Sequence, residues 1–266
     1  MEVSFMLKKL IAGSLLACSL GLFSAPMDAE AGKIQDIQAA GVLKVGSTGD
    51  YAPMSMKDPA TGEYVGFDVD VAKEIAAMLG VKVEFVPTTW KTLLADTEDK
   101  KFDMAICGIT RRANRTFTTS LSNGYLESWK TILCRKADAK KFKTEADIDK
   151  AGVKVMCNEG GTNHAYAKTL KNATVIVNKT NADIPGRIAK GEADVMITEV
   201  PEAAKYCKLM PELAAPLMNV PFADTKFNFG IMMPQGDQDF LNFINFAIDD
   251  LNVKGKMAAI KAKHLQ

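Results

Sequence analysis

The feature that most constrains the fold is an alternation of short apolar runs with amphipathic stretches, in units of about thirty residues. Each apolar run has the length of a strand and ends in a polar or glycine-rich loop, and apolar residues at helical spacing follow it. The series begins near Val42 and restarts after Lys136. Such alternation favours a mostly parallel α/β sheet, and two series predict two α/β lobes with a ligand cleft between them.

The individual elements follow from this pattern. The predicted strands cover residues 42–46, 81–86, 102–106, 153–157, 175–177, 194–198 and 227–233. The predicted helices cover residues 68–79, 90–97, 145–150, 184–190, 239–251 and 254–264, with another beginning at residue 163. Gly80 directly follows the first long helix and is expected to end it.

Composition and charge exclude several classes of protein. The chain of 266 residues has 33 Lys and Arg against 32 Asp and Glu, and 47% of its residues are hydrophobic. A hydrophobic chain of low net charge is not intrinsically disordered. A formal charge of +1 without a basic block provides no surface that follows phosphates, so we expect no nucleic-acid partner.

The first 31 residues have the pattern of a secretory signal peptide. A Lys pair at residues 8–9 precedes an apolar run over residues 10–25, and Ala-Glu-Ala at residues 29–31 is a small-residue cleavage site. We therefore expect cleavage before Gly32 and export of the mature protein to the periplasm.

Three alternatives for this leader stay open. A retained membrane anchor is disfavoured because the apolar run is short and Pro26 breaks it. Lipid attachment at Cys18 ranks second to simple cleavage, since residues 15–18 resemble a lipoprotein cleavage box. Translation could start at Met1 or at Met6, which lies just before the Lys pair.

Cysteine spacing gives little support to a metal or redox site. The four cysteines of the mature chain form neither a CxxC pair nor a zinc knuckle, and only two histidines could assist them. Each cysteine lies in or beside an apolar stretch, which is typical of a small buried hydrophobe. The sequence leaves open the disulfide state of Cys107, Cys134, Cys157 and Cys207.

A candidate ligand site follows from the rule that α/β sheets bind ligands in the loops at the carboxyl ends of their strands. The residues in those loops are Asp50, Trp90, Gly108, Thr110, Asn158, Gly161, Thr162 and Glu199. Gly160 to Thr162 also open a helix, whose free N–H groups and dipole suit a carboxylate. Arg115 could hold a carboxylate through two parallel hydrogen bonds.

Each of these residues also has a purely structural interpretation. The glycine pair could form only a turn, and Trp90 could belong to the core. Arg115 could be a solvated helix residue. Glu199 and Glu202 could serve only to complement the dipole at the start of a helix.

A set of motifs extends over essentially the whole mature chain. It comprises Val45-Gly46 with Asp50 and Pro53, Gly66-Phe67-Asp68-Val69-Asp70, Phe102-Asp103-Met104, Gly108-Ile109-Thr110 with Arg115, and Gly230-Ile231 with Pro234. These motifs resemble those of the amino-acid type of bacterial solute-binding proteins, family 3. The resemblance implies a two-lobed periplasmic-binding-protein clamshell of type II, which captures an amino acid for an ABC importer. It places lobe 1 at residues 33–128 and 228–266, and lobe 2 at residues 129–227.

The same resemblance implies roles for individual residues. Arg115 would hold the ligand α-carboxylate, with help from the backbone at Thr110 and Thr162. The acidic residue that binds the α-amino group falls on Glu199, where the family usually has Asp.

A narrower resemblance concerns Thr88-Thr89-Trp90, Lys130-Thr131, Asn158 with Gly160-Gly161-Thr162-Asn163, and Glu202. These residues are similar to those of the cyclohexadienyl dehydratases, periplasmic enzymes on this same binding fold. The resemblance implies conversion of prephenate or arogenate to phenylpyruvate or phenylalanine, with loss of water and CO2. Neither a metal nor an organic cofactor would be required, because aromatisation drives the reaction.

This narrower resemblance assigns Glu202 as the general acid, Arg115 and Lys130 as clamps for carboxylates, and Asn158 and Thr162 as orienting residues. The chain departs from the dehydratase pattern at Trp129, Glu159, His164 and Glu199. Two functions therefore compete, a dehydratase and a non-catalytic amino-acid receptor whose partner is the permease of an ABC importer. We favour the dehydratase, and the sequence leaves the oligomeric state open.

Overall fold

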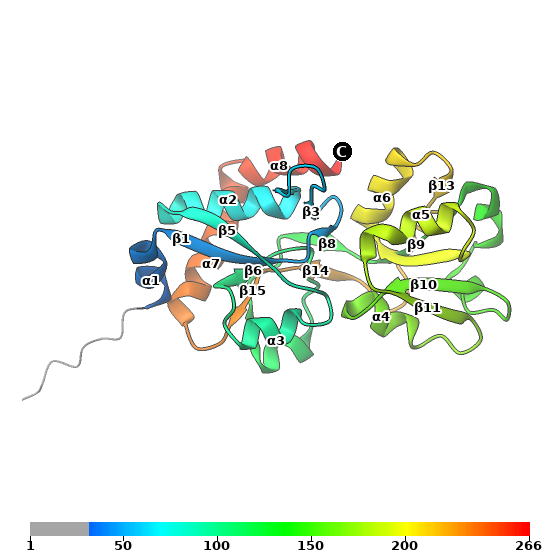
Figure 1. The fold of residues 1–266 in the computed structure, drawn as a ribbon, viewed down its shortest axis with the longest axis horizontal. Coiled ribbons are helices and arrows are strands. Elements are labelled where there is room, and N and C mark those ends of the chain that lie inside the picture. The colour runs from blue at the N-terminus through cyan, green and yellow to red at the C-terminus, as the bar shows by residue number, and fades with distance from the viewer. Residues whose placement is uncertain (1–31) are drawn as a thin grey trace, which may run out of the picture. The chain divides into compact units, whose positions relative to one another are not determined.

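Two five-stranded sheets form the framework of the protein in a computed structural model that describes residues 32–266 (Figure 1). The predicted signal peptide, the alternative lipid attachment at Cys18, and the choice of start between Met1 and Met6 all lie outside the described residues.

The first sheet contains four strands from the first half of the chain and one from near its end. In spatial order its strands are β5 (Lys82–Pro87), β1 (Val42–Ser47), β6 (Met104–Ala105), β15 (Met232–Pro234) and β7 (Thr119–Leu121). Strand β1 runs parallel to both of its neighbours, with Val45 opposite Phe85 and Met104. Strand β15 runs antiparallel to both of its neighbours.

The second sheet has the same plan. In spatial order its strands are β11 (Thr174–Asn178), β10 (Lys154–Asn158), β12 (Val195–Glu199), β9 (Lys130–Arg135) and β13 (Leu213–Ala214). Strand β10 is parallel to both neighbours, whereas β9 is antiparallel to both. The prediction of mostly parallel sheets is therefore wrong for half of the strand pairs. Strand β9 enters the second sheet directly from β8, without the crossover helix that a parallel connection requires.

The apolar runs of the second sheet are continuous because the strands are buried on both faces. Successive residues of β10 alternate between two cores: Val155 and Cys157 pack with Ala167, whereas Met156 packs with Ile188. Period-two alternation thus places a helix-covered core on each side of the sheet.

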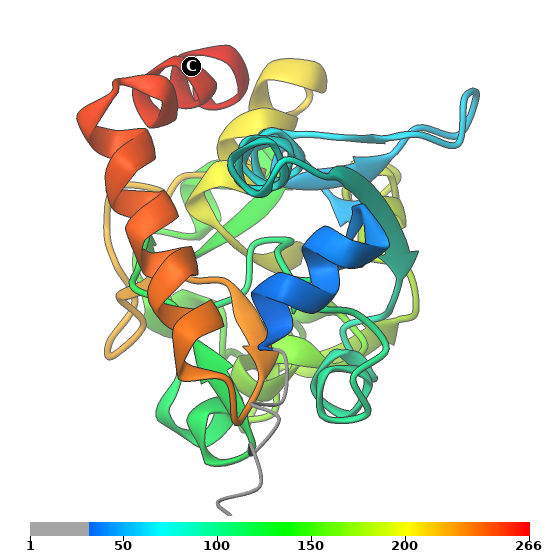
Figure 2. The same cartoon turned by 90° about the vertical axis from the view of Figure 1, so that its left-hand side faces the viewer.

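Eight α-helices cover the two sheets. They are α1 (Lys33–Ala40), α2 (Phe67–Leu79), α3 (Leu93–Glu98), α4 (Gly161–Ala167), α5 (Ile184–Ala189), α6 (Val200–Leu209), α7 (Gln238–Val253) and α8 (Lys256–Leu265). Figure 2 shows α7 and α8 beside one another, with α1 in contact with α7. Helices α1, α2, α7 and α8 contribute to one core of the first sheet, and α3 to a smaller one. None of the helices within residues 32–266 is long and apolar enough to cross a membrane.

A two-stranded ladder lies where the chain passes between the sheets. It pairs β8 (Leu126–Ser128) with β14 (Phe227–Phe229), antiparallel, and Figure 1 shows it between the two groups of elements. Strand β8 leads into β9 of the second sheet, and β14 leads back into β15 of the first. The predicted single strand over residues 227–233 is therefore two strands, because Gly230 and Ile231 lie between two different sheets. The lobe boundaries themselves stay a prediction.

Other differences from the predicted elements are local. Residues 145–150 form only a short 3₁₀ turn (η3, Glu145–Asp147), closed by a capping box between Thr144 and Asp147. Helix α3 starts at Leu93, three residues later than predicted, and α4 starts at Gly161, two residues earlier. The strands β7 to β9 were not predicted. A three-stranded sheet of β2 (Asp50–Tyr51), β3 (Ser55–Lys57) and β4 (Tyr64–Val65) and the 3₁₀ helices η1 (Ala113–Phe117), η2 (Lys136–Lys141) and η4 (Asn181–Asp183) complete the chain.

The four cysteines of residues 32–266 are free, and three of them are buried. Burial raises the pKa of the Cys107 and Cys134 thiols to about 12, so both are neutral at physiological pH. This agrees with their interpretation as small apolar core residues.

Candidate functional site

A small cavity lies between segments that follow strands of the first sheet and the strand ends and loops of the second sheet. Its lining consists of Tyr51, Trp90, Gly108, Thr110, Arg115, Asn158, Gly161, Thr162, Asn163, Asn181 and Glu199. We call it the inner cavity. Its free volume is about 10 Å³, roughly the space of one water molecule, so its own side chains nearly fill it. A ligand can therefore enter only if these side chains or the elements that carry them move apart.

The glycines of this site allow backbone segments to approach closely. Gly160 has φ of 78°, and a Cβ there would lie 2.7 Å from the Lys91 backbone. Gly108 has φ of 77°, and a Cβ there would lie 2.4 Å from the Tyr51 ring. Larger residues would separate the segments that form the cavity, so these glycines do more than form turns.

A buried ion pair between Lys130 and Glu199 dominates the electrostatics of the site. Lys130 Nζ lies 2.5 Å from Glu199 Oε1, and each side chain is 4% exposed. The register of β9 and β12 places the two residues directly opposite each other. Lys130 Nζ also donates to Thr162 Oγ1 at 2.7 Å and to Asn163 Oδ1 at 2.5 Å. Burial lowers the pKa of Lys130, and the charge of Glu199 opposes that shift.

Three hydroxyl groups complete the surroundings of Glu199. The Tyr51 hydroxyl donates to Oε2, and the hydroxyls of Thr162 and Thr110 lie 3.3 Å and 3.4 Å from Oε1. With Lys130, four donors surround one carboxylate, and a carboxylate offers about four acceptor positions. Glu199 is therefore fully engaged without any ligand.

Arg115 lies on η1 and is half-buried in the wall of the inner cavity. Its Nη1 donates to the Thr110 carbonyl oxygen at 2.6 Å, which fixes the guanidinium beside the cavity. Burial lowers the pKa of Arg115, but an arginine stays charged at any physiological pH. Its remaining donors can serve an anion in the cavity.

A second cluster of acids adjoins the inner cavity around Asn181. Asp50 accepts from Trp90 Nε1 at 2.9 Å and from the Asn181 backbone N–H at 3.1 Å. The Asn181 side-chain amide donates to Glu202 Oε1 at 2.5 Å, and the Thr198 hydroxyl donates to Glu202 Oε2 at 2.5 Å. Asn181 thus connects two carboxyl groups, one on β2 and one on α6.

Both carboxyl groups have pKa values raised above their ordinary ones. Glu202 is 0% exposed, and burial raises its pKa well above the ordinary value, with help from the negative charges of Glu199 and Asp50. Burial also raises the pKa of Asp50, although hydrogen bonds to its carboxylate oppose the shift. Glu202 therefore stays protonated to a higher pH than a free glutamic acid does.

The predicted site residues fall into three groups in the structure. Eight of them line the inner cavity, namely Trp90, Gly108, Thr110, Arg115, Asn158, Gly161, Thr162 and Glu199. Lys130 contacts Thr162 and Glu199, and Asp50 accepts a hydrogen bond from the Trp90 indole N–H. Glu202 does not line the cavity and is linked to it through Asn181. The roles of these residues stay predictions.

Three lining residues were not selected as ligand groups, namely Tyr51, Asn163 and Asn181. Asn181 follows the carboxyl end of β11, so the rule that selected the other loops could have found it. Asn163 belongs to the Asn158–Asn163 motif that carried the dehydratase resemblance. The contact of Tyr51 with Glu199 depends on the packing of two distant segments, and no local pattern signals it.

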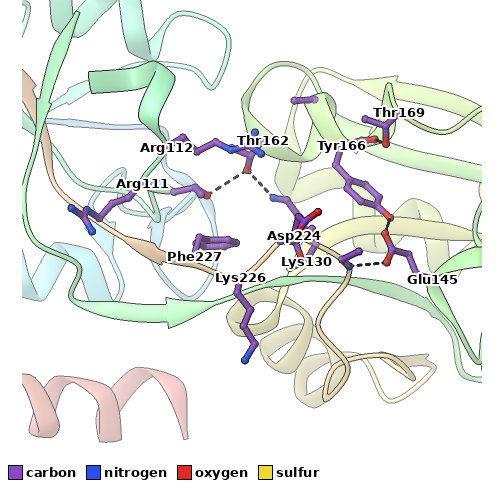
Figure 3. Close-up of a pocket in the computed structure, with 14 residues that line it drawn as sticks. Arg111, Arg112, Lys130, Glu145, Thr162, Tyr166, Thr169, Asp224, Lys226 and Phe227 are labelled. Carbon is purple, nitrogen blue, oxygen red and sulfur yellow. Dashed lines mark hydrogen bonds between the residues drawn. The ribbon is translucent and has the colours of Figure 1, made fainter. Parts of the chain in front are cut away.

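A larger cavity, which we call the outer cavity, adjoins the inner one and shares Thr110, Lys130 and Thr162 with the site. Its free volume is about 490 Å³. Figure 3 shows Thr162 close to Lys130. The Thr162 hydroxyl lies 3.4 Å from the Thr110 hydroxyl and accepts a hydrogen bond of 2.7 Å from Lys130 Nζ. Arg111, Arg112, Glu145, Tyr166, Asp224, Lys226 and Phe227 also line this cavity. The outer cavity is therefore large enough to admit a small organic molecule next to the inner one.

No group of three or more His, Cys, Asp and Glu side chains within residues 32–266 is placed to hold a metal ion. The acids of the site are instead engaged by Lys130, Tyr51, Trp90, Asn181 and threonine hydroxyls.

Two lobes with candidate ligand groups at the strand ends of both sheets are typical of a binding protein of the clamshell class, and sequence comparison agrees. Residues 43–266 match the model of the bacterial extracellular solute-binding proteins, family 3, and the chain belongs to this family. The predicted two-lobed α/β fold is thereby confirmed.

Both an enzyme and binding proteins are among its relatives. Over 208 residues, the chain is 39% identical to the cyclohexadienyl dehydratase of Pseudomonas aeruginosa, covering 78% of this chain and 77% of the enzyme. It is 25% identical to an L-cystine-binding protein of Escherichia coli, covering 99% and 97% of the two chains. The crystal structure of an ancestral amino-acid-binding protein, described as a precursor of cyclohexadienyl dehydratase, matches with a TM-score of 0.81 and 35% identity. That match covers 88% of this chain and 99% of the ancestral one.

Proposed function

We propose that this protein is a periplasmic dehydratase that acts on a cyclohexadienyl carboxylate of the prephenate type, releasing water and CO2. The observation that carries the proposal is the buried ion pair of Lys130 and Glu199. Similarity to the cyclohexadienyl dehydratase of Pseudomonas aeruginosa supports it independently.

The ion pair disfavours a ligand that carries an ammonium group. An amino-acid receptor of this family would use the carboxylate at position 199 to hold the ligand ammonium group. In this chain the Lys130 ammonium already lies 2.5 Å from that carboxylate, and three hydroxyls take its other positions. A ligand ammonium would have to displace the lysine and leave it buried and unpaired, at a cost of several kcal/mol, about 3–5. A ligand with carboxylates and no ammonium meets no such penalty.

The positive groups of the site fit a substrate with two carboxylates. Arg115 and Lys130 carry two positive charges against the single negative charge of Glu199. One carboxylate of the substrate would bind Arg115 together with the first turn of α4 at Thr162. The excess of positive charge would attract the second.

The reaction needs a proton donor and no external oxidant or reductant. The bond between the ring and its carboxylate breaks, and its electron pair enters the ring as CO2 leaves. The C4–OH bond breaks, and the hydroxyl leaves as water after it accepts a proton. Glu202 would provide that proton, because burial raises its pKa and so favours its protonated form. For direct transfer its side chain must reach the cavity past Asn181.

A second candidate function is an amino-acid receptor that delivers its ligand to the permease of an ABC importer. Similarity to an L-cystine-binding protein along nearly the whole chain favours it. In such a receptor, Glu199 would bind the ligand ammonium group after the Lys130 side chain moves away from it.

One experiment separates the two functions. Purified protein is incubated with prephenate and, separately, with arogenate, and formation of phenylpyruvate or phenylalanine is followed. We expect turnover, with prephenate preferred because it has no ammonium group. Binding of a panel of L-amino acids is measured in parallel by calorimetry. Absence of turnover together with tight binding of an amino acid would establish the receptor instead.

A further inference from the structure

The carboxyl group of Asp68 is buried next to the wall of the inner cavity, and no step of the proposed reaction uses it. It lies in the first turn of α2 and is 0% exposed. Its Oδ2 accepts a hydrogen bond from the backbone N–H of Gly108. Its Oδ1 has no hydrogen-bond partner among the described residues, and the Tyr125 hydroxyl lies close to the carboxyl group. The carboxyl group therefore contacts the ligand site through a single backbone amide.

The segment that Asp68 contacts carries ligand groups. Gly108 and Thr110 line the inner cavity, and the Thr110 carbonyl oxygen fixes the Arg115 guanidinium. The other end of the segment is held by the Gly230 N–H, which donates to the Ile109 carbonyl oxygen at 2.9 Å. At Gly108 no side chain can provide an anchor, because a Cβ would collide with the Tyr51 ring. A backbone hydrogen bond to a neighbouring side chain is the remaining means of fixing this end.

Within residues 32–266, no cationic side chain balances the charge of Asp68. The titratable groups that interact with its charge are Tyr51 on β2, Cys107 after β6 and Tyr125 before β8. Burial raises the pKa of all three, so they are neutral near pH 7. The Tyr125 hydroxyl, the Gly108 N–H and the N-terminal end of the α2 dipole are the groups that favour a negative charge.

We propose that Asp68 is a positioning residue, whose carboxylate holds the Gly108 amide and thereby places the Gly108–Thr110 segment for ligand binding. The hydrogen bond links the first turn of α2 to the wall of the inner cavity, and ligand affinity depends on it. Burial raises the pKa of Asp68 to about 7, so the strength of this contact changes with pH in the physiological range. As pH rises through that value, the carboxylate forms and becomes a stronger acceptor for the Gly108 N–H.

The direct test is a measurement on the Gly108 amide by NMR, without any ligand. In the wild-type protein we expect the Gly108 amide proton to shift with a midpoint near pH 7, following ionisation of Asp68. In Asp68→Asn we expect that titration to vanish. Exchange of the amide with solvent should then accelerate by about 10- to 100-fold, the effect of losing one hydrogen bond to a charged acceptor. A Gly108 amide that does not titrate in the wild-type protein overturns the proposal, even if the variant fails to fold.

Asp70→Asn is the matched control, since Asp70 is in the same turn of α2 but faces Lys263 and His264, each at 2.7 Å. This variant loses a surface contact with α8 and should leave the Gly108 amide unchanged. Equal acceleration of exchange in both variants would mean that Asp68 only supports the helix.

The second readout is prephenate affinity by calorimetry, and it rests on the proposed function. We expect Asp68→Asn to bind prephenate about 10- to 100-fold more weakly than wild type, and Asp70→Asn to bind it as wild type does. Equal affinity in Asp68→Asn and wild type would overturn the positioning role. If wild type itself does not bind prephenate, the proposed function fails, and the amide measurements alone decide the role of Asp68.

Discussion

The ammonium nitrogen of Lys130 lies 2.5 Å from a carboxylate oxygen of Glu199, and 4% of each side chain is exposed. The pair joins the neighbouring strands β9 and β12 at the point where they reach the inner cavity. The Glu199 carboxylate has the charge that could bind a ligand amine, but Lys130 of the same chain already provides its cation. Lys130 and Glu199 are therefore the first pair to test.

Lys130→Met should change ligand preference as well as stability. Without the lysine, Glu199 is a buried carboxylate with no counter-ion, which costs about 3–5 kcal/mol of folding free energy. A ligand ammonium can then replace the lost charge, so affinity for arogenate and for L-amino acids should rise relative to prephenate. Chemical denaturation and calorimetry measure the two effects.

Lys91→Met is the control for this substitution. Lys91 pairs with Glu159 at 2.8 Å, but its side chain is 66% exposed, so the loss should be below about 1 kcal/mol. If Lys130→Met is no less stable than Lys91→Met and selects the same ligands as wild type, the ion pair does not set specificity.

Arg115→Gln should weaken binding of any carboxylate ligand by about 2–5 kcal/mol, because the ligand charge would be left without its partner in the cavity. Arg112→Gln is a neighbouring control, since Arg112 is exposed and lines the outer cavity only. Calorimetry with prephenate measures both. Similar affinities for the two variants would show that the carboxylate binds elsewhere.

Glu202→Gln should leave prephenate binding close to that of wild type while kcat falls by about 10²- to 10⁴-fold, the contribution of a positioned general acid. The acid form is the active one, so kcat in wild type should fall as pH rises through the raised pKa of Glu202. The variant should lose this limb of the pH profile. Glu192→Gln is a surface control with the same chemical change. An unchanged kcat in Glu202→Gln would assign the proton donor to another group.

The pH dependence of stability should reveal Asp68. Its pKa is raised from 3.8 to about 7 in the folded protein, so the folded state binds more protons than the unfolded state between these values. Its contribution to stability is therefore fully present below about pH 4 and is lost as pH rises through about 7, by at most about 4 kcal/mol.

Denaturation of wild type and Asp68→Asn at several pH values should show this loss in wild type alone. Asp70 gives the opposite sign, because hydrogen bonds from His264 and Lys263 lower its pKa. Its stabilising contribution is present above its ordinary pKa of 3.8 and is lost as pH falls further. A stability difference between wild type and Asp68→Asn that stays constant from about pH 4 to pH 8 would contradict the raised pKa.

Much of the framework could be predicted from the sequence, because fully buried strands and long amphipathic helices leave local patterns. Strand β10 and helix α2 lie within one residue of their predicted bounds. The segment over residues 227–233 was misjudged because a continuous apolar run does not reveal that its two ends belong to different sheets. Strand β9 was missed because it follows β8 without the helix that the alternating pattern requires.

The candidate site was predictable where it depends on strand ends and less so where it depends on distant packing. Asn158 and Glu199 are the last residues of β10 and β12, and Thr110 lies five residues after β6, so position along the chain was a sufficient guide. The pairing of Lys130 with Glu199 depends on the register of two antiparallel strands that are 69 residues apart. No periodicity in either segment encodes such a register.

Strand β14 restricts where the chain can gain or lose residues. Phe229 forms an isolated antiparallel bridge with Thr110, and Arg111 donates to the Asn228 carbonyl oxygen at 2.9 Å. The same short strand therefore pairs with β8 and fixes the wall of the ligand cavity. Adding or deleting a single residue there would turn every following side chain to the opposite face. Related chains should consequently vary in length in other loops, and this stretch should keep a constant number of residues even where its side chains differ.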